Sequence, residues 1–421
     1  MSTQNVIETP LKAGELDPAY GSNGSTLVDG SNVVALAIWA SEGPDKGKVV
    51  GVASKGAQFK LFRLELNGVL DKGFGTDRED GIATGYTTGS FGDPATTTST
   101  VTDLMLVDGK IVLTGRVRDN PPLSPNYPAA ARFKAAGAPD LTFGQSGVFT
   151  FTEPAPVTDK TSSSAKSAGR KPKSGNILFA VNNSGITPYR DWGLLIQLTT
   201  EGNLDPAFND RGYVFFKHGG ESTTTVSAGT QANGNIIVAG STPTSGFLAG
   251  FTAAGNRDDS FGIAGFSTLR SSEGSIELRR LVLQPDQKPV AIGMLKTGTS
   301  PTSRHGWVVR TLADGKDDVS FNGGAAHITR ITLQGSQWNT GGVDSTGAIV
   351  VAGELSTRAL SLVGRITAEG QADLTFGVNG VSNPHAAGMP SYSGAIGLQA
   401  DNNIVVGARI GNLASVTRFQ G

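Results

Sequence analysis

Residues 202–241 read GNLDPAFNDRGYVFFKHGGESTTTVSAGTQANGNIIVAGS and hold one unit of an internal repeat. The unit begins with a glycine, followed three residues later by an aspartate and three residues after that by an aromatic residue. This motif recurs seven times at a spacing of about 60 residues, which is typical of repeat architectures. The motif aspartates are Asp17, Asp71, Asp140, Asp205, Asp258, Asp318 and Asp373, and the aromatics are Tyr20, Phe74, Phe143, Phe208, Phe261, Phe321 and Phe376.

Each unit contains short β-rich runs separated by Gly, Asn, Asp and Ser, which predicts four antiparallel strands. After the motif come strand d (YVFFKHGG), strand a (ESTTTVSAGTQ), the turn ANG and strand b (NIIVAGS). A loop and strand c (FLAGFTAAG) then lead into the next motif. Most of the turns between strands a and b are of the DG, NG, SG or TG type, a strong hairpin signal.

No apolar pattern of helical period is long enough for a substantial helix, so the chain is predicted to be all-β. Seven small sheets can stack as a closed propeller or as an open solenoid. The chain starts with a motif and a strand d (residues 25–29), and it stops at a strand c, SVTRFQG. We therefore predict a seven-bladed β-propeller, a single domain over residues 1–421 after a flexible tail of residues 1–13, in which the N-terminal strand completes the C-terminal blade.

The units resemble the delta-60 repeat, a bacterial module with a hairpin of the DGKIVLAG kind, an arginine-containing strand and then DGSLDxxFGxxG. Matching stretches are VDGKIVLTG (107–115), ARFKAAGAPDLTFGQSG (131–147), GNLDPAFNDRG (202–212) and AEGQADLTFGVNG (368–380). The resemblance covers essentially the whole chain and implies a propeller-like fold. It implies no particular activity, because the family carries none that could be transferred.

The motif is predicted to be structural. Its first glycine and the Gly or Asn after its aromatic are expected to adopt positive φ in the turn between strands c and d. The aspartate could bind calcium or act as an acid, but seven equivalent sites fit one active site poorly, so we expect it to cap turn amides. Five strand-c arginines lie where they can pair with motif aspartates. They are Arg63, Arg132, Arg310, Arg365 and Arg418, the last reaching across the closure to Asp17.

Composition excludes several function classes. A formal net charge of −1 disfavours nucleic acid as a partner, and no apolar run is long enough for membrane insertion. Without cysteine there are no disulfides or thiolate ligands, and the four histidines lack metal-ligand spacing, so we expect no metal and no cofactor. We expect a soluble protein, cytoplasmic or exported by a route without a recognisable signal. The oligomeric state is not readable.

Residues 161–175, TSSSAKSAGRKPKSG, could be a disordered basic linker. Aligning Asn176 with Asn235 instead places residues 164–172 on strand a of their unit, so a weak, polar inner strand is the favoured interpretation.

The variable parts of the units are better candidates for function than the repeated motif. In this strand order the b–c and d–a loops emerge on the face opposite the motif turns, and loops on a rigid scaffold commonly carry binding groups. These loops include residues 116–130, 181–192, 294–307 and 354–360. The candidate ligand-binding residues are Tyr127, Tyr189, Arg190, Asp191, Trp192, Arg304, His305, Trp307, Trp338 and Tyr392. Trp192 and Trp307 could alternatively pack on a neighbouring blade.

Three hypotheses for function follow. The first is a non-enzymatic binding or scaffold propeller that recognises a glycan or a protein through this irregular face. The second is a hydrolase or lyase with a site at the channel mouth, for which Asp103, Asp191, Asp344 and His305 are the few candidate residues. The third is a structural component of a larger secreted or toxin-associated assembly.

Overall fold

The computed structural model describes residues 12–80, 82–119, 126–152, 175–183, 191–358, 360–382 and 391–421. Within these ranges the regular structure is almost all β-strand, as predicted. Two single-turn 3-10 helices, η1(Pro301–Ser303) and η2(Asn322–Gly324), are the only helices in the described part of the chain. Neither is long or apolar enough to cross a membrane.

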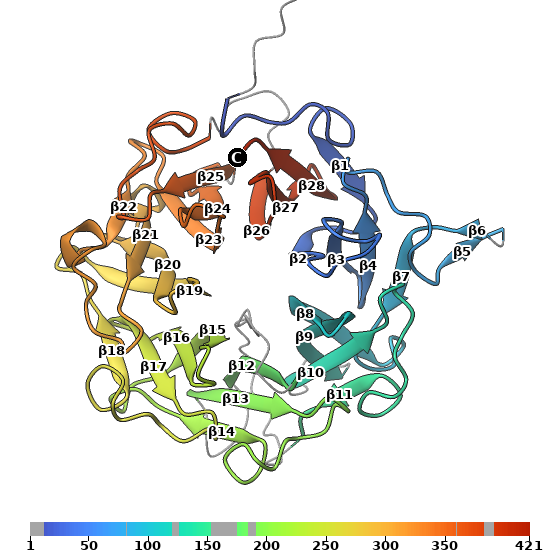
Figure 1. Cartoon of the computed structure of the whole chain (residues 1–421), viewed down its shortest axis with the longest axis horizontal. Helices are drawn as coiled ribbons and strands as arrows, with labels where there is room; N and C mark the ends of the chain where they lie inside the picture. The colour runs from blue at the N-terminus through green and yellow to red at the C-terminus, as the bar shows by residue number, and fades with distance from the viewer. Residues whose placement is uncertain are drawn as a thin grey trace, which may run out of the picture.

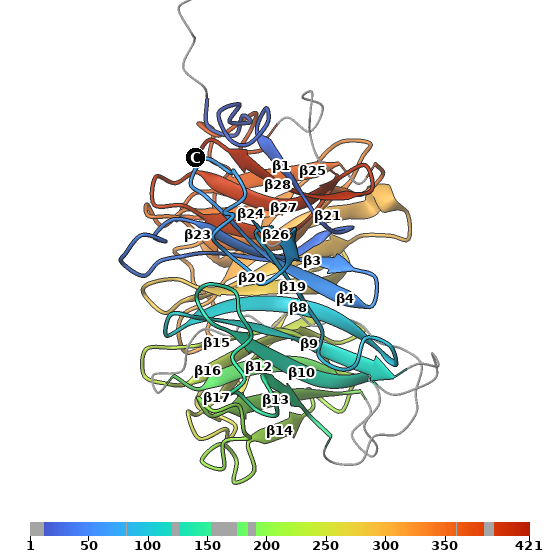
Figure 2. The ribbon, with the colours of Figure 1, turned by 90° about the vertical axis from the view of Figure 1, so that its right-hand side faces the viewer.

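Seven antiparallel sheets stand around a central axis like the blades of a propeller (Figure 1), which confirms the predicted fold. Figure 2 shows the ring from its side, with connections projecting from both faces. Blade 1 contains β2(Val33–Ile38), β3(Val49–Lys55), β4(Gln58–Leu64) and β7(Tyr86–Gly89). Blade 2 contains β8(Thr97–Val107), β9(Lys110–Asp119), β10(Asn126–Phe133) and β11(Val148–Thr150). Blade 3 contains β12(Ile177–Asn183), β13(Trp192–Leu198) and β14(Tyr213–Phe216). Blade 4 contains β15(Thr224–Thr230), β16(Ile236–Ser241), β17(Gly246–Phe251) and β18(Phe266–Leu269). Blade 5 contains β19(Ser275–Leu283), β20(Pro289–Lys296), β21(Arg304–Arg310) and β22(His327–Thr329). Blade 6 contains β23(Ser336–Val343), β24(Ile349–Leu355) and β25(Ser361–Ile366), and blade 7 contains β26(Ser391–Leu398), β27(Ile404–Ile410), β28(Leu413–Phe419) and β1(Ser25–Val28).

The two ends of the chain close the ring in blade 7. Strand β1 pairs with β28 from Ser25 opposite Thr417 to Val28 opposite Ala414, and Figure 1 shows the two strands side by side. The predicted tail of residues 1–13 is too long, because the carbonyl of Ala13 accepts a hydrogen bond from the Gly377 amide at 2.8 Å. The closing contacts therefore begin at Ala13.

Some blades depart from four strands. In blade 3 the described strands are b, c and d, and the inner strand predicted for residues 164–172 lies outside the described residues. In blade 6 strand d is reduced, within the described residues, to a single bridge between Gly364 and Val381. The insertion in the second motif forms a small hairpin, β5(Arg78–Glu79) with β6(Ile82–Ala83).

The apolar core is divided among the blade interfaces. Seven clusters of buried apolar side chains form, each drawn mainly from two adjacent blades. The motif aromatics belong to these clusters and are at most 3% exposed. They act as wedges between the blades, and burial of such large rings is a major source of stability.

The motif glycines make the wedges possible. All seven have φ between 79° and 87°, a region that only glycine adopts at low cost. A Cβ at Gly68 would lie 2.8 Å from the Tyr20 ring, and a Cβ at Gly255 would lie 2.8 Å from the Phe208 ring. The residue after each aromatic also has positive φ, and its amide donates to a carbonyl in the next motif turn, as Gly75 does to Ala136 at 2.8 Å. Seven such bonds join the blades into a ring.

The motif aspartates cap their own turns, as predicted. In all seven, the Oδ1 atom accepts the amide two residues further on. For Asp71 this donor is the Gly73 amide at 2.9 Å. The free Oδ2 atom is then available for a cation.

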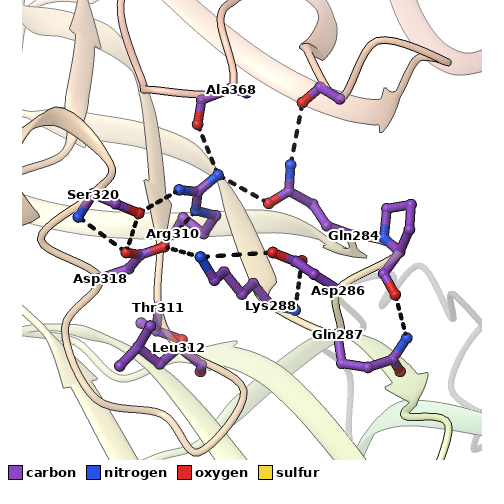
Figure 3. Close-up of polar contacts among 12 residues, drawn as sticks. Gln284, Asp286, Gln287, Lys288, Arg310, Thr311, Leu312, Asp318, Ser320 and Ala368 are labelled. Atoms are coloured by element: carbon purple, nitrogen blue, oxygen red, sulfur yellow. Dashed lines mark hydrogen bonds and ion pairs between the residues drawn. The ribbon is translucent and has the colours of Figure 1, made fainter.

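All five predicted arginine–aspartate pairs are present, with Nε to Oδ2 distances between 2.6 and 2.8 Å. Arg310 illustrates the arrangement in Figure 3: it binds Asp318 at 2.7 Å, and its Nη1 donates to the Ala368 carbonyl of the next blade at 2.7 Å. Its guanidinium also lies over the Phe321 ring, 5.1 Å from the centroid. The arginines therefore connect neighbouring blades as well as strands.

These pairs predict loss of stability in acid. Burial alone would raise the pKa of Asp318, but hydrogen bonds from Ser320, Arg310 and Lys288 outweigh it and lower the pKa from 3.8 to about 2. A carboxyl with a lowered folded-state pKa stabilises the fold above its unfolded pKa and stops doing so as the pH falls through the folded value. We expect Asp318 to contribute about 2 kcal/mol that is present above pH ~5 and lost toward pH ~2.

The measurement is the free energy of unfolding by denaturant between pH 7 and pH 2. Asp318→Asn should start from lower stability and lose about 2 kcal/mol less over this range than the wild type. If the free energy of unfolding fell equally with pH in the two proteins, the stabilising role of the Asp318 carboxylate would be contradicted. The control is Asp259→Asn, because Asp259 is exposed and pairs only with exposed Arg257 among the described residues.

Candidate functional site

The two faces of the propeller differ in how similar the blades are in sequence. We call the face with the a–b and c–d turns the turn face, and the face with the b–c and d–a connections the loop face. Strand register places Ser275, where β19 begins, opposite Lys296, where β20 ends, so both residues lie at the loop face. The motif lies at the turn face. Residues 116–119 and 126–130, predicted as loop, continue β9 and β10 instead.

Each described inner strand contains a β-bulge at an equivalent position. The register shifts in β2, β8, β15, β19, β23 and β26. The residues left without a partner in the first five strands are Val34, Thr102, Val226, Arg279 and Asn339, and in β26 the shift spans 392–394. A bulge bends its strand and redirects a side chain. The bulge is thus common to the described inner strands, while the side chain at the bulge differs.

A pocket of about 440 Å³ opens between blades 4, 5, 6 and 7 at the loop face. We call it the mouth pocket, and its polar walls include Glu277, Arg279, Lys296, Asn339 and Tyr392. Glu277 accepts from both cations: Arg279 Nη2 lies 2.5 Å from its Oε1 atom, and Lys296 binds Oε2. Arg279 and Lys296 keep more than a third of their side chains exposed. They are therefore accessible to a ligand.

A second polar group borders the mouth pocket. Gln337 connects Arg304, whose Nη1 donates at 3.4 Å, to Glu354, whose Oε1 accepts at 2.7 Å. Burial raises the pKa of Glu354, and the charge of Arg279 opposes this shift. Tyr392 is close by: burial raises the pKa of its hydroxyl, and the charge of Glu354 adds to the increase.

The charges around the mouth pocket are unequal. Among the residues that line the pocket, the cations are Arg279 and Lys296 and the acid is Glu277. Two cations against one carboxylate leave the lining with an excess of positive charge. Arg304 and Arg409 lie outside the lining and act on Glu354 through their charges.

The structure brings only part of the predicted site together. Tyr392 lines the mouth pocket, whereas Arg304 lies outside its lining and binds Gln337. His305 follows Arg304 in β21, and burial together with the charge of Arg330 lowers its pKa. Tyr127 is half-buried in β10, on another blade, and Trp192 begins β13. Asp191 has φ of 63° and its carbonyl accepts from Thr223. Tyr189 and Arg190 lie outside the described residues.

Two of the candidate ligand-binding tryptophans are buried, and for Trp307 this agrees with the alternative of packing on a neighbouring blade. Trp307 and Trp338 are 2% and 1% exposed and belong to core clusters. The Trp338 indole lies against Gly306 of the neighbouring blade, where an added Cβ would be 2.3 Å from its Nε1 atom. Trp338 therefore fills space between blades 5 and 6 and cannot stack on an incoming ring.

The four residues considered for a hydrolase or lyase do not meet in one place. Asp103 pairs with Arg280 inside the channel at 3.1 Å. Asp344 caps an a–b turn at the turn face by accepting from Thr346 and Ala348. Asp191 lies near the start of blade 3, and His305 is on β21. The described ranges also contain no group of three or more residues able to hold a metal ion.

Comparison with protein-family models and with curated proteins finds no match. Among solved structures, the chain is similar to virginiamycin B lyase from Staphylococcus aureus, with 10% identity, 94% of this chain and 98% of that chain covered, and a TM-score of 0.53. It is also similar to the WD40 β-propeller domain of Doa1, with 9% identity, 97% of both chains covered and a TM-score of 0.51. At these identities the likeness supports the fold alone. The delta-60 resemblance stays a prediction.

The sequence-based prediction missed Glu277, Arg279, Lys296, Asn339 and Glu354. A signal for one of them was present. Glu354 lies near the end of strand b, at a position that varies from unit to unit: the equivalents include Ser54, Arg116, Ser241 and Arg409. Comparing that position across the units would have pointed to the loop face.

Proposed function

We propose that this protein is a non-enzymatic binding propeller that recognises a glycan through the mouth pocket. The observation that carries the proposal is the composition of the pocket walls, where donors and acceptors from four different blades converge at positions that the repeat leaves variable. Binding sites combine a concave shape with a few polar groups that fix orientation. A hydroxyl-rich ligand can both donate to Glu277 and accept from Arg279 and Asn339. The excess of positive charge favours an acidic glycan.

The surface around the mouth pocket suits a protein partner less well than a glycan. Stable protein interfaces have a mainly apolar, aromatic-rich centre. The large exposed apolar side chains of the described residues include Leu141, Val319 and Leu374, which follow motif aspartates at the turn face. Trp307 and Trp338, which could have anchored a partner at the loop face, are buried. Recognition of a protein is retained as an outcome of the test.

The test is a glycan array with acidic and neutral members, followed by calorimetry on the best binder. Arg279→Ala with Lys296→Ala should weaken binding by about 10-fold or more, because each removes a charge-assisted hydrogen bond. Both side chains are partly exposed, so folding should persist. The matched control is Arg257→Ala with Lys316→Ala, which removes two exposed turn-face cations, each paired with one acid.

The proposal predicts that the control double variant binds within about 2-fold of wild type. If no glycan binds, a cross-linking screen can recover a protein partner instead. A partner whose cross-linking depends on Arg279 and Lys296 would show that the ligand of the mouth pocket is a protein and not a glycan. Equal weakening by both double variants would refute the mouth pocket as the site.

A further inference from the structure

The central channel is crossed by an ion pair. Arg280 on β19 of blade 5 donates from Nη1 to Asp103 Oδ2, on β8 of blade 2, at 3.1 Å. These blades are three positions apart, which is as far apart as two blades of a seven-membered ring can be. Both residues directly follow the bulge of their inner strand. Asp103 is largely buried, and its Oδ1 atom accepts the Leu104 amide at 2.9 Å.

This pair lies at the boundary between two separate pockets. The mouth pocket reaches down to Arg279, and a second pocket of about 440 Å³ begins with Arg280 and extends toward the turn face. The two pockets share no lining residue. The second is walled largely by apolar residues, among them Leu104, Leu281 and Leu398. The channel therefore changes from polar to apolar where the ion pair crosses it.

We infer that the mouth pocket is blind and binds the terminal unit of a glycan chain, with the Arg280–Asp103 pair as its floor. The inference rests on the proposed function and specifies its ligand. A chain bound through an internal unit needs two ways out of the site, one for each neighbouring unit. Among the described residues, the ion pair and the largely apolar second pocket lie below the mouth pocket, so a polar chain bound there leaves toward the loop face.

Arg280 and Asp103 act here as positioning residues. Consecutive side chains of a regular strand point to opposite faces, but the bulge at Arg279 interrupts this alternation, so that both residues face the channel, Arg279 in the mouth pocket and Arg280 in the second pocket. Tying Arg280 to a carboxylate across the channel holds the bulge of β19 in this register. The floor therefore also fixes the position of Arg279.

The test compares an array-selected linear oligosaccharide with the same chain capped at its terminal unit by a bulky ether, using the full-length protein and calorimetry. Capping should weaken wild-type binding by about 10-fold or more, while an equal substituent on an internal unit should change it by less than about 3-fold. Arg280→Ala with Asp103→Ala removes the floor and should reduce the penalty for capping to below about 3-fold. The charge exchange Arg280→Asp with Asp103→Arg restores a pair and should restore the penalty.

The outcomes separate the two proposals. If the glycan binds and Arg279→Ala with Lys296→Ala abolishes binding, but capping has no effect, chain-end recognition is refuted and the mouth-pocket function stands. If no glycan binds, both proposals are refuted. A capping penalty that persists without the floor refutes the role of Arg280 and Asp103.

Discussion

Arg310→Ala is expected to lower the free energy of unfolding by about 3 kcal/mol or more, because it leaves the buried Asp318 carboxylate without its main partner. The guanidinium is 7% exposed and the carboxylate 3%. Arg310 also donates to Gln284 and Ser320 and to the Ala368 carbonyl of blade 6, so the substitution removes one of the hydrogen bonds between blades 5 and 6 (Figure 3). Lys288 lies 3.2 Å from Asp318 and balances only part of the carboxylate charge once the guanidinium is removed.

Denaturant unfolding at pH 7 measures this loss. Arg257→Ala is the control, since its pair with Asp259 is exposed and should be worth no more than about 1 kcal/mol. Arg365→Ala should fall between the two, because its pair with Asp373 is more exposed than that of Arg310. A loss at Arg310 no larger than at Arg257 would show that the pairs do not hold the blades together.

Removal of the N-terminal closing segment is expected to have the largest effect. A chain beginning at residue 30 lacks β1, the fully buried Tyr20 and the Asp17 carboxylate that binds Arg418 Nε at 2.7 Å. Losing a buried aromatic costs about 3 to 5 kcal/mol, and the pairing of β1 with β28 and the Asp17–Arg418 ion pair are lost with it. We expect the shortened chain to lose more than about 5 kcal/mol of stability.

A synthetic peptide of residues 12–29 provides the decisive comparison. Added to the shortened chain, it should restore the unfolding midpoint in a concentration-dependent way, because binding to the folded state stabilises it. The same peptide with Asp17→Ala and Tyr20→Ala should not. Unchanged stability of the shortened chain would contradict closure of the ring by β1.

The sequence predicted the contacts of the repeated motif well, because these contacts are local and recur in every unit. Positive φ at the motif glycines, turn capping by the aspartates and the arginine pairs each depend on residues close to one another in sequence or at a fixed offset between units. Seven copies in register made each assignment unambiguous. The ring closure followed because the strands missing at one end are present at the other.

The candidate site could not be predicted in the same way. Inner strands alternate between faces, but the bulges interrupt this alternation, so that the consecutive residues Arg279 and Arg280 both line pockets of the channel. Sequence spacing does not show where a bulge falls. Trp338 was misassigned because its burial depends on Gly306, which belongs to another blade. Contacts of that kind are set by packing between units.

The most direct test of the account is a crystal structure of the full chain with a bound acidic oligosaccharide from the array. We predict one terminal unit in the mouth pocket, with oxygen atoms within hydrogen-bond distance of Arg279 and Lys296 and the chain leaving toward the loop face. A ligand bound instead to the motif turns at the turn face, with the mouth pocket free of it, would contradict the central claim that function lies where the blades differ.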